Sequence, residues 1–235
     1  MCTVSYVPIK DGYVFTFNRD EDPNRYTPHF ITRQKLLQKE IFYAKDNKAG
    51  GTWFATDSLG NAAMLFNGAF TRHQKKTGYA KSRGVILLQL VAAQNMLDYF
   101  DNENMHTIEP FSIILFENKN LYRLVWDGMN KHVLPMQETN AHIFSSATLY
   151  EENIQQLRKE WLAEFMQQQI INSEALLHFH SNYKNTDKQN GMVIERPGGC
   201  STLSISQAVI TQQATVIKHV DLKTGMQYQQ QILLN

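Results

Sequence analysis

Turn-forming residues divide this chain into short β-hairpins, which are interrupted by a few longer segments with helical periodicity. Aromatic and β-branched runs flank polar turns such as Lys10, Asp11 and Gly12, a pattern typical of antiparallel strand pairs. The predicted order is strands, a helix, strands, helices and strands, without the regular alternation that indicates a parallel sheet. We therefore expect an α+β protein with two mostly antiparallel sheets and helices on the outside.

The spacing of apolar residues predicts the individual elements. A helix is expected over 83–100, where Val85, Leu88, Ala92 and Met96 keep helical spacing, and a second helix over 151–171. A third, short helix is expected to start at a Ser173 cap and to end at 179. The polar segment before residue 48 is expected to hold one or two helical turns at 34–38. The expected strands are 3–8, 13–17, 52–55, 62–66, 111–116, 121–126, 132–136, 192–195, 201–210, 215–221 and 226–234.

Length and charge limit the classes of function. We expect one domain over residues 1–235, because a chain of 235 residues can bury one large core. A formal net charge of +1 provides no cationic field for nucleic acid. The longest apolar run, within 84–93, is shorter than the roughly 20 residues that a transmembrane segment needs. No signal peptide is recognisable, so we expect a cytoplasmic protein. A chain of this length does not need a disulfide to be stable, so we expect Cys2 and Cys200 to be free thiols; a Cys2–Cys200 bridge is the alternative.

Cys2 is the strongest candidate for chemistry, because removal of Met1 would make it the N-terminal residue. Its thiol and the new α-amino group would then form a nucleophile with its own base. An amine with a pKa of about 7.7 to 8.0 can accept the proton of a thiol whose pKa is about 8.5. The alternative is a cysteine that stands at the second position without any such role.

The residues that follow resemble the NRDE family, also called the transport and Golgi organisation two family. The first hairpin ends in Asn18, Arg19, Asp20 and Glu21, the four residues that give the family its name. The family's pattern is also matched, in order and spacing, by Gly50-Gly51-Thr52-Trp53, by a Gly60-Asn61 turn with a strand that closes on Asn67, and by Arg83-Gly84. The resemblance implies an N-terminal-nucleophile hydrolase fold, a four-layer αββα sandwich similar to bile-salt hydrolases and penicillin acylases. Those relatives cleave amide bonds with an N-terminal cysteine.

The resemblance also implies roles for individual residues. Cys2 would be the nucleophile, and Arg19 and Asp20 would orient its thiol and amine. Asn67 would donate its side-chain amide to the oxyanion. For Arg19 and Asp20 the alternative is a salt bridge that only fixes the hairpin. The residues expected to bind substrate are Trp53, Ser146 and Ser201.

Ser146 and Ser201 mark two departures from the family's pattern. Related sequences usually carry Ser-Asn before the second long helix, whereas this chain has Ser145 and Ser146. Ser146 therefore stands where bile-salt hydrolases have a second asparagine that helps to form the oxyanion site. A Gly-Thr-Arg motif is frequent near the C-terminus of the family, but the cation is missing here before Ser201. Arg196, five residues earlier, is an alternative source of charge.

Two functions are compatible with these residues. The first is an amide or ester hydrolase, or an acyltransferase, that acts on a small or lipid-like acyl substrate through an acyl-Cys2 intermediate. The alternative is a non-catalytic protein that binds a lipid, acyl-CoA or haem, with basic residues of 72–83 near an anionic head group. We expect no cofactor for catalysis and no metal site, because His178, His180 and Asp187 fit no closed zinc spacing.

Overall fold

The computed structural model describes residues 2–27, 30–74 and 76–234. Its helices are α1 (Arg83–Ala92), α2 (Met96–Asn102), α3 (Glu152–Gln168), α4 (Ser173–Asn182) and a 3-10 turn at Pro23–Arg25. Its strands are β1 (Cys2–Ile9), β2 (Gly12–Glu21), β3 (Ile31–Leu36), β4 (Lys39–Lys45), β5 (Thr52–Asp57), β6 (Ala62–Asn67), β7 (Phe111–Glu117), β8 (Asn120–Trp126), β9 (Lys131–Met136), β10 (His142–Ser145), β11 (Ser201–Thr211), β12 (Ala214–Asp221) and β13 (Gln227–Leu233).

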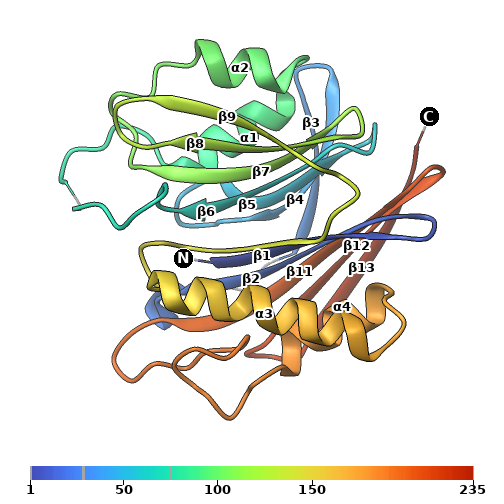
Figure 1. The fold of residues 1–235 in the computed structure, drawn as a ribbon. Helices are drawn as coiled ribbons and strands as arrows, with labels where there is room; N and C mark the ends of the chain where they lie inside the picture. The colour runs from blue at the N-terminus through green and yellow to red at the C-terminus, as the bar shows by residue number, and fades with distance from the viewer. Residues whose placement is uncertain (1, 28–29, 75, 235) are drawn as a thin grey trace.

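The described strands form two antiparallel sheets that face each other. The first sheet has six strands in the order β10-β1-β2-β11-β12-β13, and the second has seven in the order β3-β4-β5-β6-β7-β8-β9. Helices α1 and α2 cover the outer face of the seven-stranded sheet, and α3 and α4 cover the outer face of the six-stranded sheet (Figure 1). The predicted four-layer αββα sandwich is therefore confirmed.

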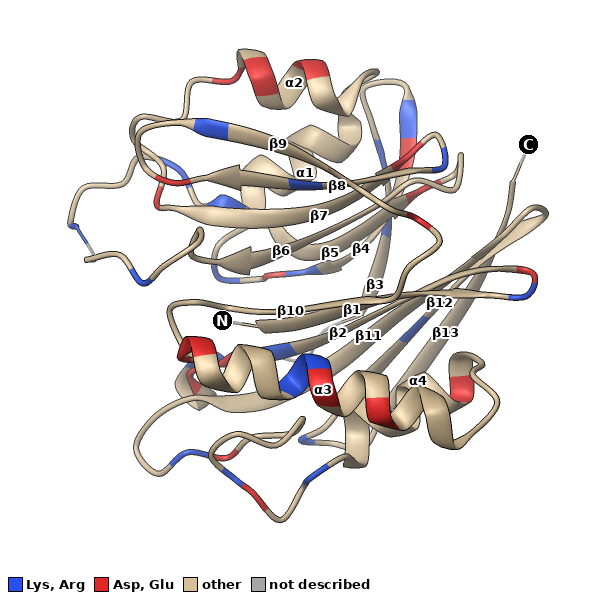
Figure 2. Ribbon diagram, in the orientation of Figure 1, with Lys and Arg blue, Asp and Glu red and all other residues tan. Residues whose placement is uncertain are grey.

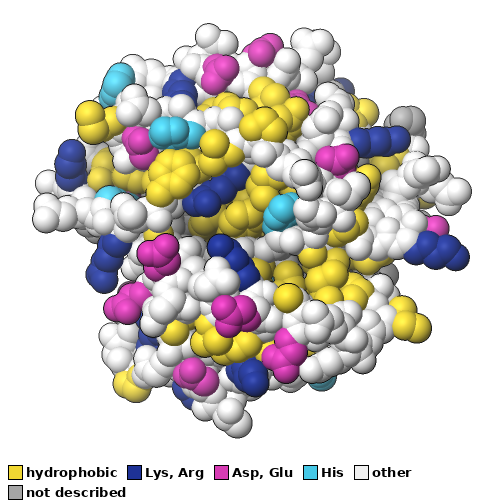
Figure 3. Space-filling model, in the orientation of Figure 1, with side chains coloured by type: hydrophobic (Ala, Val, Ile, Leu, Met, Phe, Trp, Pro, Cys, Tyr) yellow, Lys and Arg dark blue, Asp and Glu magenta, His cyan; other side chains and the backbone are white. Residues whose placement is uncertain are grey.

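Three apolar layers hold the four layers of secondary structure together. Between the sheets, Tyr6 and Phe15 pack against Phe116, with ring centres 6.3 and 5.7 Å apart. Other buried clusters lie between α1–α2 and the seven-stranded sheet and between α3–α4 and the six-stranded sheet. Alternating side chains of the central strands thus contact either the opposite sheet or the helices. On the face seen in Figure 3, hydrophobic side chains gather across the middle of the molecule.

The prediction of helical turns at 34–38 is wrong, because β3 and β4 form a hairpin there. Leu37 occupies the turn with a φ of 52°. β3 lies at the edge of its sheet, and its residues Arg33, Gln34 and Lys35 are exposed. An exposed edge strand does not need alternating apolar residues, so the alternation that would have predicted a strand is absent from this segment.

The predicted helix over 83–100 is two helices. Asn95 begins α2, since its side chain accepts a hydrogen bond from the backbone N–H of Asp98. Glu117 also accepts the N–H of Met96, 2.8 Å away. The third helix is longer than predicted, and its cap is Asn172 rather than Ser173. The second helix ends at Gln168, earlier than predicted, and residues 192–195 make only an isolated bridge between Glu195 and Ser201.

Two glycines set the distance between α1 and the seven-stranded sheet. A Cβ atom on Gly51 would lie 2.2 Å from the carbonyl carbon of Gly84, and one on Gly84 would lie 2.8 Å from the carbonyl oxygen of Thr52. The start of α1 therefore packs on the start of β5 through backbone alone. Both Cys2 and Cys200 are free thiols, as predicted, and both are buried. Acidic and basic residues are interspersed over both halves of the molecule (Figure 2).

Candidate active site

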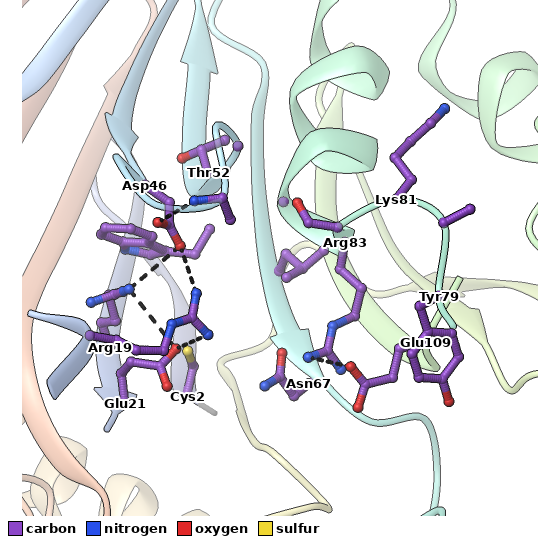
Figure 4. A pocket seen from close by; sticks show the side chains of 18 residues that line it. Cys2, Arg19, Glu21, Asp46, Thr52, Asn67, Tyr79, Lys81, Arg83 and Glu109 are labelled. Carbon is purple, nitrogen blue, oxygen red and sulfur yellow. Dashed lines mark hydrogen bonds and ion pairs between the residues drawn. The ribbon is translucent and has the colours of Figure 1, made fainter. Parts of the chain in front are cut away.

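A cavity of about 350 Å³ lies where the N-terminal end of β1 meets the seven-stranded sheet and α1. Cys2, Arg19 and Glu21 contribute one wall from the six-stranded sheet (Figure 4). Trp53 and Asn67 come from the opposite sheet, and Arg83 comes from the first turn of α1. Four predicted site residues, Cys2, Arg19, Trp53 and Asn67, therefore line the same cavity.

The thiol of Cys2 is nearly buried, with an exposed fraction of 4%. Cys2 pairs directly with Arg19 in the β1–β2 register, so both side chains lie on the cavity side of the sheet. Burial raises the pKa of the Cys2 thiol, whereas the charge of Arg19 and a hydrogen bond from the backbone of Asp20 oppose this rise. Met1, whose removal the catalytic hypothesis requires, lies outside the described residues.

Arg19 is held between an aromatic ring and two carboxylates. Its guanidinium lies over the Trp53 ring, with 4.1 Å from Cζ to the ring centre. Its Nη2 atom is 3.7 Å from Asp46 Oδ2 and 3.9 Å from Glu21 Oε2. Arg25 approaches the same two carboxylates at 3.3 and 3.2 Å. The guanidinium of Arg19 is thus kept beside Cys2, although burial lowers its pKa.

Asp20 does not join this cluster, because its side chain points to the opposite face of β2. It accepts hydrogen bonds from the hydroxyl groups of Tyr150, at 2.8 Å, and Thr202, at 2.7 Å. Burial raises the pKa of Asp20, and the nearby charge of Arg158 opposes the rise. Adjacent residues of a strand face opposite ways, so the Arg19–Asp20 pair expected in one place is divided between two layers. Glu21 is the carboxylate of this motif that lines the cavity.

Asn67 stands at the end of β6 and lines the cavity, whereas Ser146 lies buried behind it. The Ser146 hydroxyl donates to the backbone carbonyl of Asn67 at 2.6 Å. The Ser146 backbone N–H donates to the carbonyl of Cys2 at 2.9 Å. Ser146 is not among the described residues that line the cavity, although it contacts two that are.

Ser201 lies opposite Glu21 in the β2–β11 register, but it does not line the cavity either. Arg196 does not replace the missing cation. It donates to the carbonyl of Leu149 and packs its guanidinium on the Tyr150 ring, 5.2 Å from the ring centre. The C-terminal segment therefore contributes hydrogen bonding behind β2 rather than charge in the cavity.

Arg83 supplies a cation from a different part of the chain. Its side chain is 17% exposed and forms an ion pair with Glu109 at 3.0 Å. Glu109 also lies 3.1 Å from His73 Nε2. Burial lowers the pKa of Arg83, and the charge of Glu109 opposes this effect. The sequence placed Arg83 in a matching motif and among the basic residues of 72–83, and its position before Gly84 was the signal that could have placed it at the cavity.

His178 and His180 do not converge on one site. His178 is exposed on α4, whereas His180 is fully buried beside Ser5 and Asn18, at 2.8 and 2.5 Å. Burial lowers the pKa of His180 to about 3. Across the described ranges, no three His, Cys, Asp or Glu side chains are grouped so that they could hold a metal ion. Over the same residues, none of the helices has the length and apolarity to cross a membrane.

Comparison with known proteins gives this geometry a context. The family model described as Transport and Golgi organisation 2 matches residues 1–227. A search of curated proteins gave no match. Among solved structures, the chain is similar to the mutant C2A of the conjugated bile acid hydrolase from Clostridium perfringens, at 8% identity and a TM-score of 0.54. That match covers 98% of this chain and 96% of the other.

Two further structures show the same likeness. Penicillin V acylase from Agrobacterium tumefaciens is 8% identical with a TM-score of 0.56, over 97% of this chain and 85% of that one. The Caenorhabditis elegans ortholog of N-acylethanolamine-hydrolyzing acid amidase is 12% identical with a TM-score of 0.61, over 88% and 92%. At such identities the likeness shows the fold alone, which is that of the N-terminal-nucleophile hydrolases.

Proposed function

Since the chain belongs to the transport and Golgi organisation 2 family and has an N-terminal-nucleophile hydrolase fold, we propose that it is an N-terminal-cysteine hydrolase or acyltransferase. Its substrate would be a small or lipid-like acyl amide or ester. The chemistry would pass through an acyl-Cys2 thioester after Met1 has been removed. The observation that carries the proposal is the shared cavity of Cys2, Arg19 and Asn67.

The proposed reaction uses the groups in that cavity in sequence. The α-amino group of Cys2 takes the thiol proton, and the thiolate attacks the carbonyl carbon of the substrate. The side-chain amide of Asn67 donates to the oxygen that becomes negative. The protonated amine then gives its proton to the leaving amine or alcohol as the carbonyl forms again. Water or a second nucleophile attacks the thioester, which releases the acyl group and restores the thiol.

Arg19 supports this reaction through charge. A thiolate is the reactive form of cysteine, and an adjacent guanidinium favours it. Because Arg19 is stacked on Trp53 and paired with Asp46, its charge is in place before a substrate arrives. Burial of Cys2 acts in the opposite direction. The freed amine of the mature chain would add a further positive charge beside the thiol.

The size and lining of the cavity suit a small acyl group. Its volume of about 350 Å³ is at the lower end of the range of about 300–1,000 Å³ for small-molecule sites. Leu65 and Trp53 are its larger apolar lining residues, and charged groups surround them. A long acyl chain would have to extend out of the cavity.

Intact-mass measurement of the purified protein is the first test. Loss of Met1 is expected, and retention of Met1 would contradict the proposal because no free amine would stand beside the thiol. The mature protein is then mixed with activated esters and chromogenic amides of graded acyl length. The expected result is a mass increase of one acyl group on Cys2, absent in Cys2→Ala. Acylation of both proteins to the same extent would show that Cys2 is not the nucleophile.

A non-catalytic binding function is the second candidate, and two observations favour it. Burial raises the pKa of the Cys2 thiol, and the hydroxyl of Ser146 is already used by Asn67. In that case the cavity would bind an acyl-CoA, a lipid or haem without turnover. Native mass spectrometry of the Cys2→Ala variant with acyl-CoA and with haem, compared with acylation of the wild-type chain, distinguishes the two candidate functions. Binding without any acylation of the wild-type chain supports this candidate, and failure to bind either one counts against it.

A further inference from the structure

Ser146 connects the two sheets at the candidate active site. It follows β10, and it is fully buried. Its backbone N–H donates to the carbonyl of Cys2, which belongs to the six-stranded sheet, at 2.9 Å. Its hydroxyl donates to the carbonyl of Asn67, which belongs to the seven-stranded sheet, at 2.6 Å. One residue thus makes a hydrogen bond to the main chain of both the proposed nucleophile and the proposed oxyanion donor.

The proton of the Ser146 hydroxyl is committed to this contact. A serine hydroxyl donates one hydrogen bond, and here the acceptor is Asn67. The other hydroxyl within reach is Thr148 Oγ1 at 2.8 Å. Because the carbonyl of Asn67 can only accept, Ser146 uses its proton there, and Thr148 must then be the donor to Ser146 Oγ. Ser146 Oγ therefore has no proton for an oxyanion in the cavity, which it does not line.

The turn after Asn67 depends on such contacts, since it has an unusual backbone. Gly68 has a φ of +87°, and a Cβ atom there would lie 2.9 Å from the side chain of Thr148. The hydroxyl of Ser112 donates to the carbonyl of Gly68 at 3.0 Å, and Arg123 donates to the carbonyl of Ala69 at 3.2 Å. Ser146 provides the corresponding bond for Asn67 itself. These bonds come from β7, from β8 and from the residue after β10, and they hold the turn from several directions.

We propose that Ser146 is a positioning residue, which holds the backbone of Asn67 at a constant distance from Cys2 and does not itself donate to the oxyanion. This inference rests on the proposed function for its effect on the reaction rate. It corrects the substrate-binding role that the family's pattern assigned to Ser146. It also explains how this chain accommodates serine at that place: the side chain that contacts the oxyanion remains Asn67, and Ser146 acts through it.

A double-mutant cycle on the mature protein tests this assignment. The rate of Cys2 acylation by p-nitrophenyl acetate is measured in wild type, Ser146→Ala, Asn67→Ala and the double variant. A positioning residue acts only through Asn67. Ser146→Ala should therefore slow acylation about tenfold when Asn67 is present, and should leave the rate unchanged when it is added to Asn67→Ala. The bond to the backbone carbonyl at position 67 persists in Asn67→Ala. Equal fold-reductions in both backgrounds would show that Ser146 contributes on its own and would overturn the proposal.

Ser145→Ala is the matched control. Ser145 is the buried serine that directly precedes Ser146, and its hydroxyl contacts Thr3 and Arg158 rather than Asn67. We expect the Ser145→Ala rate to stay within about twofold of wild type, because it removes no contact with the turn. Ser146→Thr keeps a hydroxyl at this position, so its acylation rate should be closer to that of wild type than the rate of Ser146→Ala is.

Hydrogen exchange separates this inference from the proposed function. If the wild-type chain is not acylated, the proposed hydrolase or transferase function fails, and the positioning role is decided by exchange of amides in 66–70. Ser146→Ala should exchange there about tenfold faster than Ser145→Ala, because of these two serines only Ser146 bonds to the turn. Equal exchange in the two variants would overturn the positioning role whatever the activity.

Discussion

The guanidinium of Arg19 lies over the ring of Trp53, with its Cζ 4.1 Å from the centre of the ring. Arg19 belongs to β2 and Trp53 to β5, so this contact joins the two sheets at the cavity. A cation over an aromatic ring contributes about 0.5 to 2 kcal/mol, depending on how far it is desolvated. Both side chains here are buried, which places the contact in the upper part of that range.

Coupling between these two residues should be measurable in unfolding experiments. We expect Arg19→Met and Trp53→Leu to interact by about 1 to 2 kcal/mol in a double-mutant cycle of urea unfolding. The control cycle uses Trp126→Leu in place of Trp53→Leu. Trp126 is a buried tryptophan on the helix side of its sheet, so its substitution and Arg19→Met should have additive effects. Additive effects with Trp53 as well would show that the stacking is energetically unimportant.

Removal of the Arg19 charge should make the Cys2 thiol harder to ionise. The charge of Arg19 opposes the effect of burial on the Cys2 pKa, so Arg19→Met should move the midpoint of Cys2 alkylation by iodoacetamide to higher pH. Arg25→Met is the control, because Arg25 pairs with the same two carboxylates, but the charge that acts on the Cys2 pKa is that of Arg19. A midpoint that stays in place or falls in Arg19→Met would mean that Arg19 does not act on the thiol.

Gly51→Ala should destabilise the protein and disturb the cavity wall. Its Cβ atom would lie 2.2 Å from the carbonyl carbon of Gly84, which belongs to helix backbone and cannot rotate away. Overpacking of this kind costs about 1 to 3 kcal/mol in unfolding free energy. Gly199→Ala serves as control, since its nearest neighbour atom would be 3.7 Å away. Equal midpoints of urea unfolding for the two variants would contradict the close approach.

His180 should make stability depend on pH in the acid range. Burial lowers its pKa from 6.5 to about 3 in the folded chain, so the unfolded chain binds more protons between these values. The unfolding free energy should therefore fall as the pH drops, by about 2 kcal/mol between pH 7 and pH 5. In His180→Gln this fall in unfolding free energy should be smaller. Other groups, such as Asp20, are present in both proteins, so their contributions cancel in the comparison. Identical slopes in the two proteins would refute the assignment.

The local pattern of residues was sufficient to predict most of the fold. Short hairpins with polar turns define antiparallel sheets whatever their final neighbours, because strand alternation and turn chemistry act over a few residues. Where local signals were weak, the prediction was wrong. The edge strand β3 has exposed side chains that show no alternation, and the cap at Asn95 divides a segment whose apolar spacing looked continuous.

The candidate site was predicted only in part. Alternation along β2 already places Arg19 and Asp20 on opposite faces, but it does not say which face meets the second sheet and which meets α3 and α4. The packing of four layers decides this: Asp20 contacts Tyr150, whereas Arg19 pairs with Glu21 and Asp46. The sequence by itself determined the hairpins, the nucleophile candidate and the glycines that allow close approach. Only the tertiary structure decided that Arg83 supplies a cation and that Ser146 bonds to both Cys2 and Asn67, because these contacts join segments that are distant along the chain.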